Sequence, residues 1–246
     1  LVSLGIGSAG VMLALIRRRE KVQLQWGIHP SWDALRPILR ISGPAFSEKI
    51  AFHTAFMIFA GYVGHLGMEA MTANQALIAI ESLGFIVAHG FSVASAALVA
   101  QKLGAKESEV AEQCGWISAG LGTMVLGAIG LIFWFFPAEL VGAFTDEVAI
   151  IEMAIPCLRV AAVVQPMMAI TEALAGGLRG AGDTRSPLVA ALVGPGLVRL
   201  VACWFLAFHL DWGLIGIWYG TSLDWLIRVI FLVIVYKRGR WKTIAV

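Results

Sequence analysis

Three glutamates and two histidines lie within long apolar stretches of the chain, where an ionisable side chain can bind a proton or a cation. Glu48 precedes His53 by five residues and Glu81 precedes His89 by eight, so each pair is predicted to lie on nearly the same face of a helix. Glu172 lies in a third apolar stretch. A charge at the centre of a membrane helix costs roughly 2.5–3.5 kcal/mol by insertion scales, so each acid needs a partner or a function. The candidates for ion or cation binding are therefore these five residues.

Each acid also has a purely structural interpretation. Glu48 begins only about one turn inside its stretch, so its side chain could extend to the polar surface. Glu81 could form a hydrogen bond that fixes the packing of two helices. Pro156 and Pro166 remove backbone donors from the stretch that contains Glu172, which frees carbonyl groups to coordinate a cation or lets the helix bend. The residues alone leave both interpretations open.

Four further charged residues in apolar stretches are interpreted as structural. Arg159 and Arg199 have no acid four positions away, and a packing or carbonyl-capping role is predicted for Arg159. Asp224 and Arg228 form an acid-before-base pair at i, i+4 and are predicted to satisfy each other. None of these is expected to contact a ligand.

The composition identifies the elements that position these residues as membrane helices. Hydrophobic residues make up 59% of 246 positions and charged residues 14%, whereas soluble domains have about 45–50% and 25%. The net charge of +2 gives no reason to expect a nucleic acid partner. No cofactor or metal is expected, because the cysteines lie singly in apolar runs without a histidine at ligand spacing: Cys114, Cys157 and Cys203.

Six stretches are long enough to cross a hydrocarbon core of ~30 Å as helices. They are residues 45–65, 73–98, 115–136, 150–175, 188–208 and 213–236. A partial apolar stretch covers residues 1–16, without an initial Met, a basic n-region or a cleavage site, so we predict a truncated helix and no signal peptide. The predicted fold is an all-α polytopic membrane protein, a six-helix unit with a partial preceding helix.

The basic residues of the connections all fall on one predicted side of the membrane. Fourteen Lys and Arg residues lie there: Arg17, Arg18, Arg19, Lys21, Arg36, Arg40, Lys102, Lys106, Arg179, Arg185, Lys237, Arg238, Arg240 and Lys242. The opposite connections, around residues 66–72, 137–149 and 209–212, contain none. The positive-inside rule therefore predicts a cytoplasmic linker at 17–44, with an interfacial amphipathic helix near 31–41, and a basic cytoplasmic tail at 237–246.

The segment EALAGGLRGAGDTRSP, residues 172–187, predicts a tight hairpin at this cytoplasmic side. Gly176 and Gly180 form a small-xxx-small pair that allows two helices to approach closely, and Gly182 lies in the turn. Arg179, Asp183 and Arg185 supply a charged turn, which we expect to bind a neighbouring loop.

These residues carry a family resemblance. LRGAGDTRSP after a Pro166-containing helix resembles a signature of the multidrug and toxic compound extrusion (MATE) transporters. Residues 74–105 and 144–160, which include the CLRV sequence around Arg159, are similar to the eighth helix of that family and to the approach to its tenth. The three matches occur in family order.

The resemblance implies the second lobe of a twelve-helix transporter, with residues 1–16 as a remnant of the first lobe and the missing lobe as a partner. One branch of the family binds sodium through an acid in each of two helices, and this sequence has Phe52 and Met168 there, with Glu48 and Glu172 one turn away. The expected activity is export of cationic or amphipathic organic compounds from the cell through the inner membrane, coupled to proton or sodium influx.

Three alternatives compete with this function. A lipid-linked oligosaccharide flippase of the same broad fold would need a cavity rich in Arg and Lys, which Arg159 and Arg199 alone do not supply. An enzyme is not expected, because the chain contains no HExxH and no GxSxG motif. The chain could also be a membrane fragment that does not transport by itself.

Overall fold

The computed structural model describes residues 32–243, and within that range the chain is helical throughout, with short connections. The helices in chain order are α2 (Trp32–His65), α3 (Met68–Gly104), α4 (Ser108–Phe135), α5 (Pro137–Gly142), α6 (Val148–Gly180), α7 (Arg185–Val193), α8 (Leu200–Trp204) and α9 (Gly213–Arg238). The predicted remnant at 1–16 and the first part of the linker lie outside the described residues. All-helical structure agrees with the prediction for a chain that must satisfy its backbone groups in lipid.

The chain divides into two compact units, Leu1–Arg40 and Ile41–Val246, and the contacts described below lie within the second unit. Helix α2 begins at Trp32 and continues without interruption to His65, through Pro37 and Pro44. No helix boundary therefore separates the predicted interfacial segment from the predicted first span.

Five of the described helices are long and apolar enough to cross a membrane. They are α3, α4, α6, the run Arg185–His209 and α9. Helix α2 has 34 residues but is not among the five, because Glu48, Lys49, His53 and His65 lower its hydropathy. A sixth span at residues 45–65 stays a prediction.

The run Arg185–His209 is an α-helix interrupted twice by π-helical turns, at Gly194–Arg199 and Phe205–His209. The first π turn contains Pro195, which has no backbone N–H to donate and which therefore disturbs the regular i→i−4 pattern. Arg199 is the last residue of this turn.

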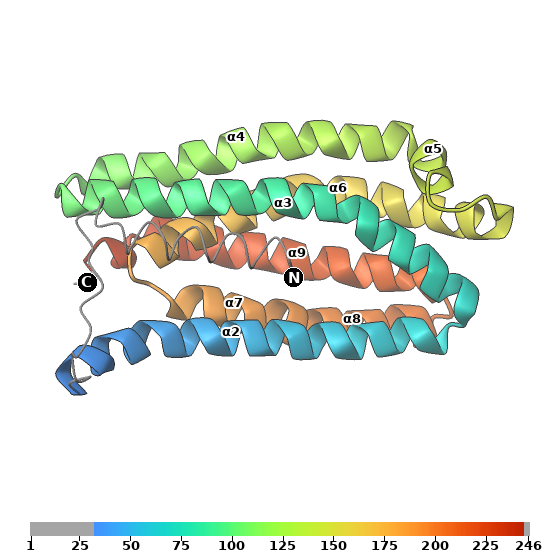
Figure 1. Cartoon of the computed structure of the whole chain (residues 1–246), viewed down its shortest axis with the longest axis horizontal. Coiled ribbons are helices and arrows are strands. Elements are labelled where there is room, and N and C mark those ends of the chain that lie inside the picture. The colour runs from blue at the N-terminus through green and yellow to red at the C-terminus, as the bar shows by residue number, and fades with distance from the viewer. Residues whose placement is uncertain (1–31, 244–246) are drawn as a thin grey trace, which may run out of the picture. The chain divides into compact units, whose positions relative to one another are not determined.

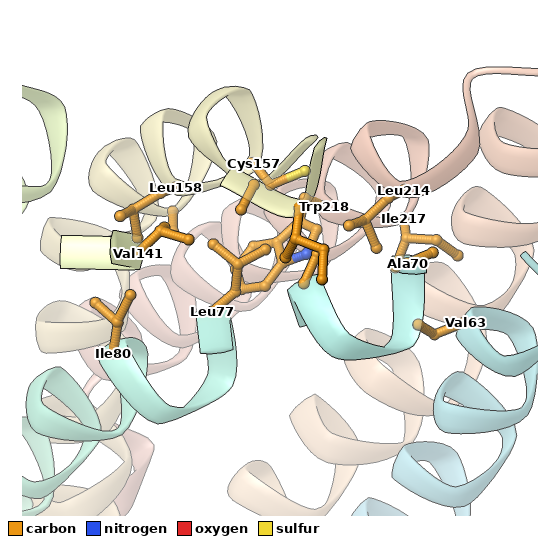
Figure 2. Packing of buried hydrophobic residues seen from close by; sticks show 14 of the residues in the cluster. Val63, Ala70, Leu77, Ile80, Val141, Cys157, Leu158, Leu214, Ile217 and Trp218 are labelled. Atoms are coloured by element: carbon orange, nitrogen blue, oxygen red, sulfur yellow. The ribbon is translucent and has the colours of Figure 1, made fainter. Parts of the chain in front are cut away.

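Helix α6 lies at the centre of the packing. Half of its most apolar window is buried, which is the largest share among the five candidate spans. Figure 2 shows one of the apolar clusters around it, in which side chains of α2, α3, α5, α6 and α9 meet, including Leu77, Leu158 and Trp218. Away from this core, Met57, Ile86 and Met124 are at least 70% exposed, as expected for side chains that face lipid.

The connections alternate between the two ends of the bundle (Figure 1). The α3–α4 and α6–α7 connections and the carboxyl end of α9 share one end, and these three segments contain Lys102, Lys106, Arg179, Arg185, Lys237, Arg238, Arg240 and Lys242. We call this the basic end. The α2–α3 turn, the α5 region and the α8–α9 connection share the other end, as the charge asymmetry of the sequence predicts.

Candidate functional site

Four side chains from three helices form a polar cluster toward the basic end. Arg179, in the last turn of α6, donates from Nη1 to Glu48 Oε1 of α2 at 2.8 Å and from Nη2 to Ser92 Oγ of α3 at 3.4 Å. Its Nη2 also lies 3.7 Å from Glu172 Oε2. We call these four residues the Arg179 cluster. It joins two of the predicted ion-binding acids, Glu48 and Glu172, to one residue of the predicted hairpin.

The helix spacing and the glycine pair explain how this cluster is assembled. Glu172 and Arg179 are seven residues apart, which places them on one face of α6, two turns apart. A Cβ atom at Gly176 would overlap the backbone of Ser92, and one at Gly180 would overlap the backbone of Ala96. The structure thus shows the close helix approach that the small-xxx-small pair predicts, and this approach brings Ser92 within reach of Arg179.

The Arg179 cluster is partly exposed and carries a net negative charge. The side chains of Glu48, Glu172 and Arg179 are 15%, 24% and 29% exposed. Two carboxylates and one guanidinium give a net charge of −1 when all three are ionised. The cluster is therefore partly accessible and, in that state, negatively charged.

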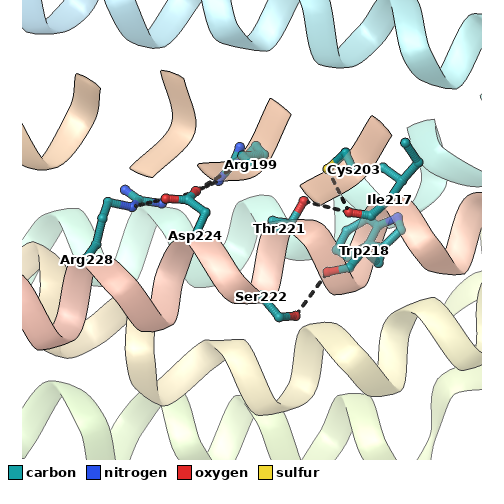
Figure 3. A network of polar contacts seen from close by, with 8 residues as sticks. All are labelled: Arg199, Cys203, Ile217, Trp218, Thr221, Ser222, Asp224 and Arg228. Atoms are coloured by element: carbon teal, nitrogen blue, oxygen red, sulfur yellow. Dashed lines mark hydrogen bonds and ion pairs between the residues drawn. The ribbon is translucent and has the colours of Figure 1, made fainter. Parts of the chain in front are cut away.

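A second polar cluster is buried in the bundle (Figure 3). Asp224 of α9 is fully buried and accepts hydrogen bonds from Arg199 Nε at 2.9 Å and from Arg228 Nε at 2.8 Å and Nη2 at 3.0 Å. The predicted Asp224–Arg228 pair is therefore present, and Arg199 joins it from the π turn. Gly194 leaves room for the pair, because a Cβ there would overlap both Asp224 and Arg228.

Aromatic rings complete the surroundings of the two buried arginines. The Arg228 guanidinium lies 3.6 Å from the centroid of the Trp225 ring, and that of Arg199 lies 6.0 Å from the centroid of Phe59. Cation–π contacts of this kind stabilise a desolvated guanidinium. Both arginines are 6–7% exposed and bound to a carboxylate, so they offer no free surface for an anionic ligand.

Glu81 of α3 is a further buried acid in the bundle. It is 7% exposed, and one carboxylate oxygen has no hydrogen-bond partner among the described residues. Two arginines and two acids, Glu81 and Asp224, give zero net charge when all are ionised.

The two predicted Glu–His arrangements are not assembled. His53 and His89 are exposed, whereas Glu81 is buried and Glu48 is bound to Arg179. Eight residues along a helix correspond to about 80° of rotation beyond two full turns, which is enough to point His89 away from the face that buries Glu81. Glu81 and His89 therefore lie on different faces of α3, and a role for either in ion coupling stays a prediction.

The turn after α6 is stabilised locally. Gly182 adopts φ +83°, in the left-handed region that favours glycine. Asp183 accepts hydrogen bonds from the backbone N–H groups of Arg185 and Ser186 and from the Ser186 hydroxyl, which satisfies donors at the start of α7. Arg185 is exposed. Asp183 thus forms a cap within the turn, and the predicted contact of Asp183 and Arg185 with a neighbouring loop stays a prediction.

The remaining predicted residues stay outside both clusters. Arg159 is exposed on α6, and Pro166 lies inside that helix, which continues through it to Gly180. Within residues 32–243 there is no group of three or more His, Cys, Asp and Glu side chains that could hold a metal ion. The sequence did not indicate Ser92 as a hydrogen-bond partner of Arg179, because a serine in a run of small residues has no feature that marks it as a polar contact.

Comparisons with known proteins find a matching family model and curated relatives for this chain. The family model described as MatE matches residues 44–205. A probable multidrug resistance protein NorM from Thermotoga maritima is 31% identical over 243 residues, which covers 97% of this chain and 52% of that protein. A NorM relative from Pseudomonas putida is also 31% identical, over 79% of this chain and 43% of the relative.

A solved structure of a MATE protein in a bent conformation superimposes with a TM-score of 0.84 at 17% identity, over 97% of this chain and 53% of that chain. The chain thus spans about half the length of the curated relatives and the solved structure that it matches.

Proposed function

Because this chain belongs to the MatE family, the multidrug and toxic compound extrusion transporters, we propose that it forms the second lobe of a secondary transporter. The transporter exports cationic or amphipathic organic compounds in exchange for protons or sodium ions. The first lobe, which this chain does not contain, supplies the facing half of a central cavity. Rocking of the two lobes moves that cavity between the sides of the membrane, as in other two-repeat transporters.

The Arg179 cluster is the observation that supports cation export most directly. Its two carboxylates come from different helices, α2 and α6, and both are partly exposed. A cation that binds there changes the charge between those helices, and with it the attraction between Glu48 of α2 and Arg179 of α6. Binding and helix movement are thereby linked through the same two side chains.

Of the two coupling ions, we favour the proton. The Arg179 guanidinium already lies near both carboxylates, and among the described residues Ser92 supplies the one neutral oxygen to which it donates a hydrogen bond. Protonation of Glu48 or Glu172 needs no further oxygen ligands, whereas a sodium ion would need several. Glu81 is a second candidate for proton binding, because of its unpartnered buried carboxylate oxygen.

The orientation proposed for the chain follows its basic residues. We assign the basic end of the bundle, with the carboxyl end of α9, to the cytoplasm and the chain to the inner membrane, by the positive-inside rule.

The test is ethidium export by the full-length transporter, reconstituted with an inward gradient of protons or of sodium. Glu48→Gln and Glu172→Gln should each reduce the export rate at least tenfold, because each removes one carboxylate of the cluster. Export should follow the proton gradient. Glu152→Gln, at an exposed acid of the same helix α6, is the matched control and should export normally.

Normal export by both cluster variants would exclude the Arg179 cluster as the cation site. Export driven by sodium alone would exclude the proton as the coupling ion.

A further inference from the structure

We propose that Arg179 limits the charge of the exported compound to one, so that the site selects monovalent organic cations over divalent ones. This inference rests on the proposed function and adds a specificity-determining residue to it. With Arg179 present, the cluster carries a net charge of −1. A bound compound with one positive charge makes the site neutral, and a compound with two leaves the site with an excess of one positive charge.

The two carboxylates are not equally available. Glu48 is held by a hydrogen bond of 2.8 Å from Arg179, whereas Glu172 lies 3.7 Å from the same guanidinium. A cation that approaches Glu172 need not displace Arg179, which keeps its contacts with Glu48 and Ser92. Glu172 is therefore the acceptor of the incoming charge.

Because the Arg179 cluster is partly buried, its net charge influences the binding of a charged compound. The three charged side chains are 15–29% exposed, so an excess positive charge among them would be less screened than at an open surface. The same excess on an exposed site would be largely neutralised by solvent and salt.

Other charged residues near the Arg179 cluster do not change its net charge. The buried charges of Arg199, Asp224 and Arg228 are bound to one another. Lys49, next to Glu48, is exposed and therefore screened.

Loss of the Arg179 charge would change the site from −1 to −2. Because an electrostatic energy scales with the product of the two charges, a dication gains twice as much from this change as a monocation. The ratio of the affinity for the dication to the affinity for the monocation therefore measures the effect of the Arg179 charge. A general gain or loss of binding affects both affinities equally and leaves this ratio unchanged.

The experiment compares ethidium, a monocation, with propidium, a dication that shares its phenanthridinium ring. Dissociation constants are measured by dye fluorescence at pH 8 with the purified full-length transporter. The wild type should bind ethidium more tightly than propidium. Arg179→Gln should shift the ratio of the two constants at least tenfold toward propidium, and Arg179→Lys, which keeps the charge, should not. Arg179→Met serves the same purpose if the Gln variant folds poorly.

An unchanged ratio in the neutral variants would overturn the inference. Arg185→Gln removes an exposed cation from the same connection, and it should leave the ratio unchanged. An equal shift in that variant would assign the effect to surface potential and would also overturn the inference. Glu172→Gln separates the two proposals: if it binds ethidium normally, the proposed site itself is wrong, whatever the Arg179 variants show.

Discussion

Replacement of Asp224 by Asn tests whether this carboxylate stabilises the two buried arginines, Arg199 and Arg228. The substitution keeps the shape of the side chain, so it leaves no cavity. It removes the charge that Arg199 and Arg228 share and offers them an amide with donors of its own. The buried group, neutral with Glu81 and Asp224 ionised, becomes positive by one unit.

The burial of Asp224 and its hydrogen bonds give the size of the expected loss of stability. Asp224 is fully buried and accepts three hydrogen bonds of 2.8–3.0 Å from the two guanidinium groups. Breaking a buried ion pair by removal of one partner costs about 3–5 kcal/mol. Soluble domains of comparable size lose about 2–4 °C of melting temperature per kcal/mol, so we expect Asp224→Asn to lower the melting temperature by at least ~6 °C.

The assay is thermal unfolding of the detergent-purified transporter, followed by tryptophan fluorescence. Asp211→Asn is the matched control, because Asp211 is exposed and its φ of +54° is one that Asn also adopts. Glu81→Gln should destabilise less than Asp224→Asn, since it removes a balancing charge but breaks none of the three hydrogen bonds. The double variant Asp224→Asn/Arg199→Met restores zero net charge and should be more stable than Asp224→Asn alone.

A melting temperature of Asp224→Asn equal to that of the control would refute the argument that this carboxylate holds the arginines. A double variant no more stable than Asp224→Asn would show that net charge is not the cause of the loss.

Three further predictions concern packing and orientation. Gly176→Ala should destabilise the protein by about 1–3 kcal/mol in thermal unfolding, because its Cβ would overlap the backbone of Ser92. Trp241→Ala should cost about 3–5 kcal/mol in the same assay, since this indole is 1% exposed and stacks on a buried tyrosine. Met68→Cys, at the end opposite the basic end, should react with an impermeant thiol reagent outside intact cells, and Arg185→Cys should not.

Each of these predictions has a control and a contradicting result. Gly120→Ala meets no atom within 4 Å of its Cβ and should be neutral or stabilising, so equal losses at both glycines would remove the packing argument. Trp212→Ala, at an indole that is 48% exposed, should cost less than Trp241→Ala. Labelling of Arg185→Cys alone would reverse the proposed orientation.

The sequence by itself determined the properties that depend on local composition and spacing. The fraction of apolar residues required membrane helices, because backbone groups in lipid must be satisfied within a segment. The Gly176–Gly180 spacing indicated a close helix contact, since two small residues four apart leave one helix face flat. The order of the family motifs predicted the MATE family, which the family model confirms.

The tertiary structure decided which charged groups meet. Arg179 and Glu48 are 131 residues apart, and no periodicity indicates that α2 and α6 face each other at that depth. Arg199 has no acid within four positions, and its partner Asp224 is 25 residues away on another helix. In the same way, the histidines expected beside Glu48 and Glu81 proved to be exposed.

The physical reason is that helical spacing fixes only the direction of a side chain around its own axis. The partner across an interface depends on the rotation, depth and separation of a second helix, which are set by packing of the whole bundle. At Arg179, the contact with Ser92 depends on the close approach of α3, which Gly176 and Gly180 allow. Arg199 is the last residue of a π turn that the sequence indicates only through Pro195 and two glycines.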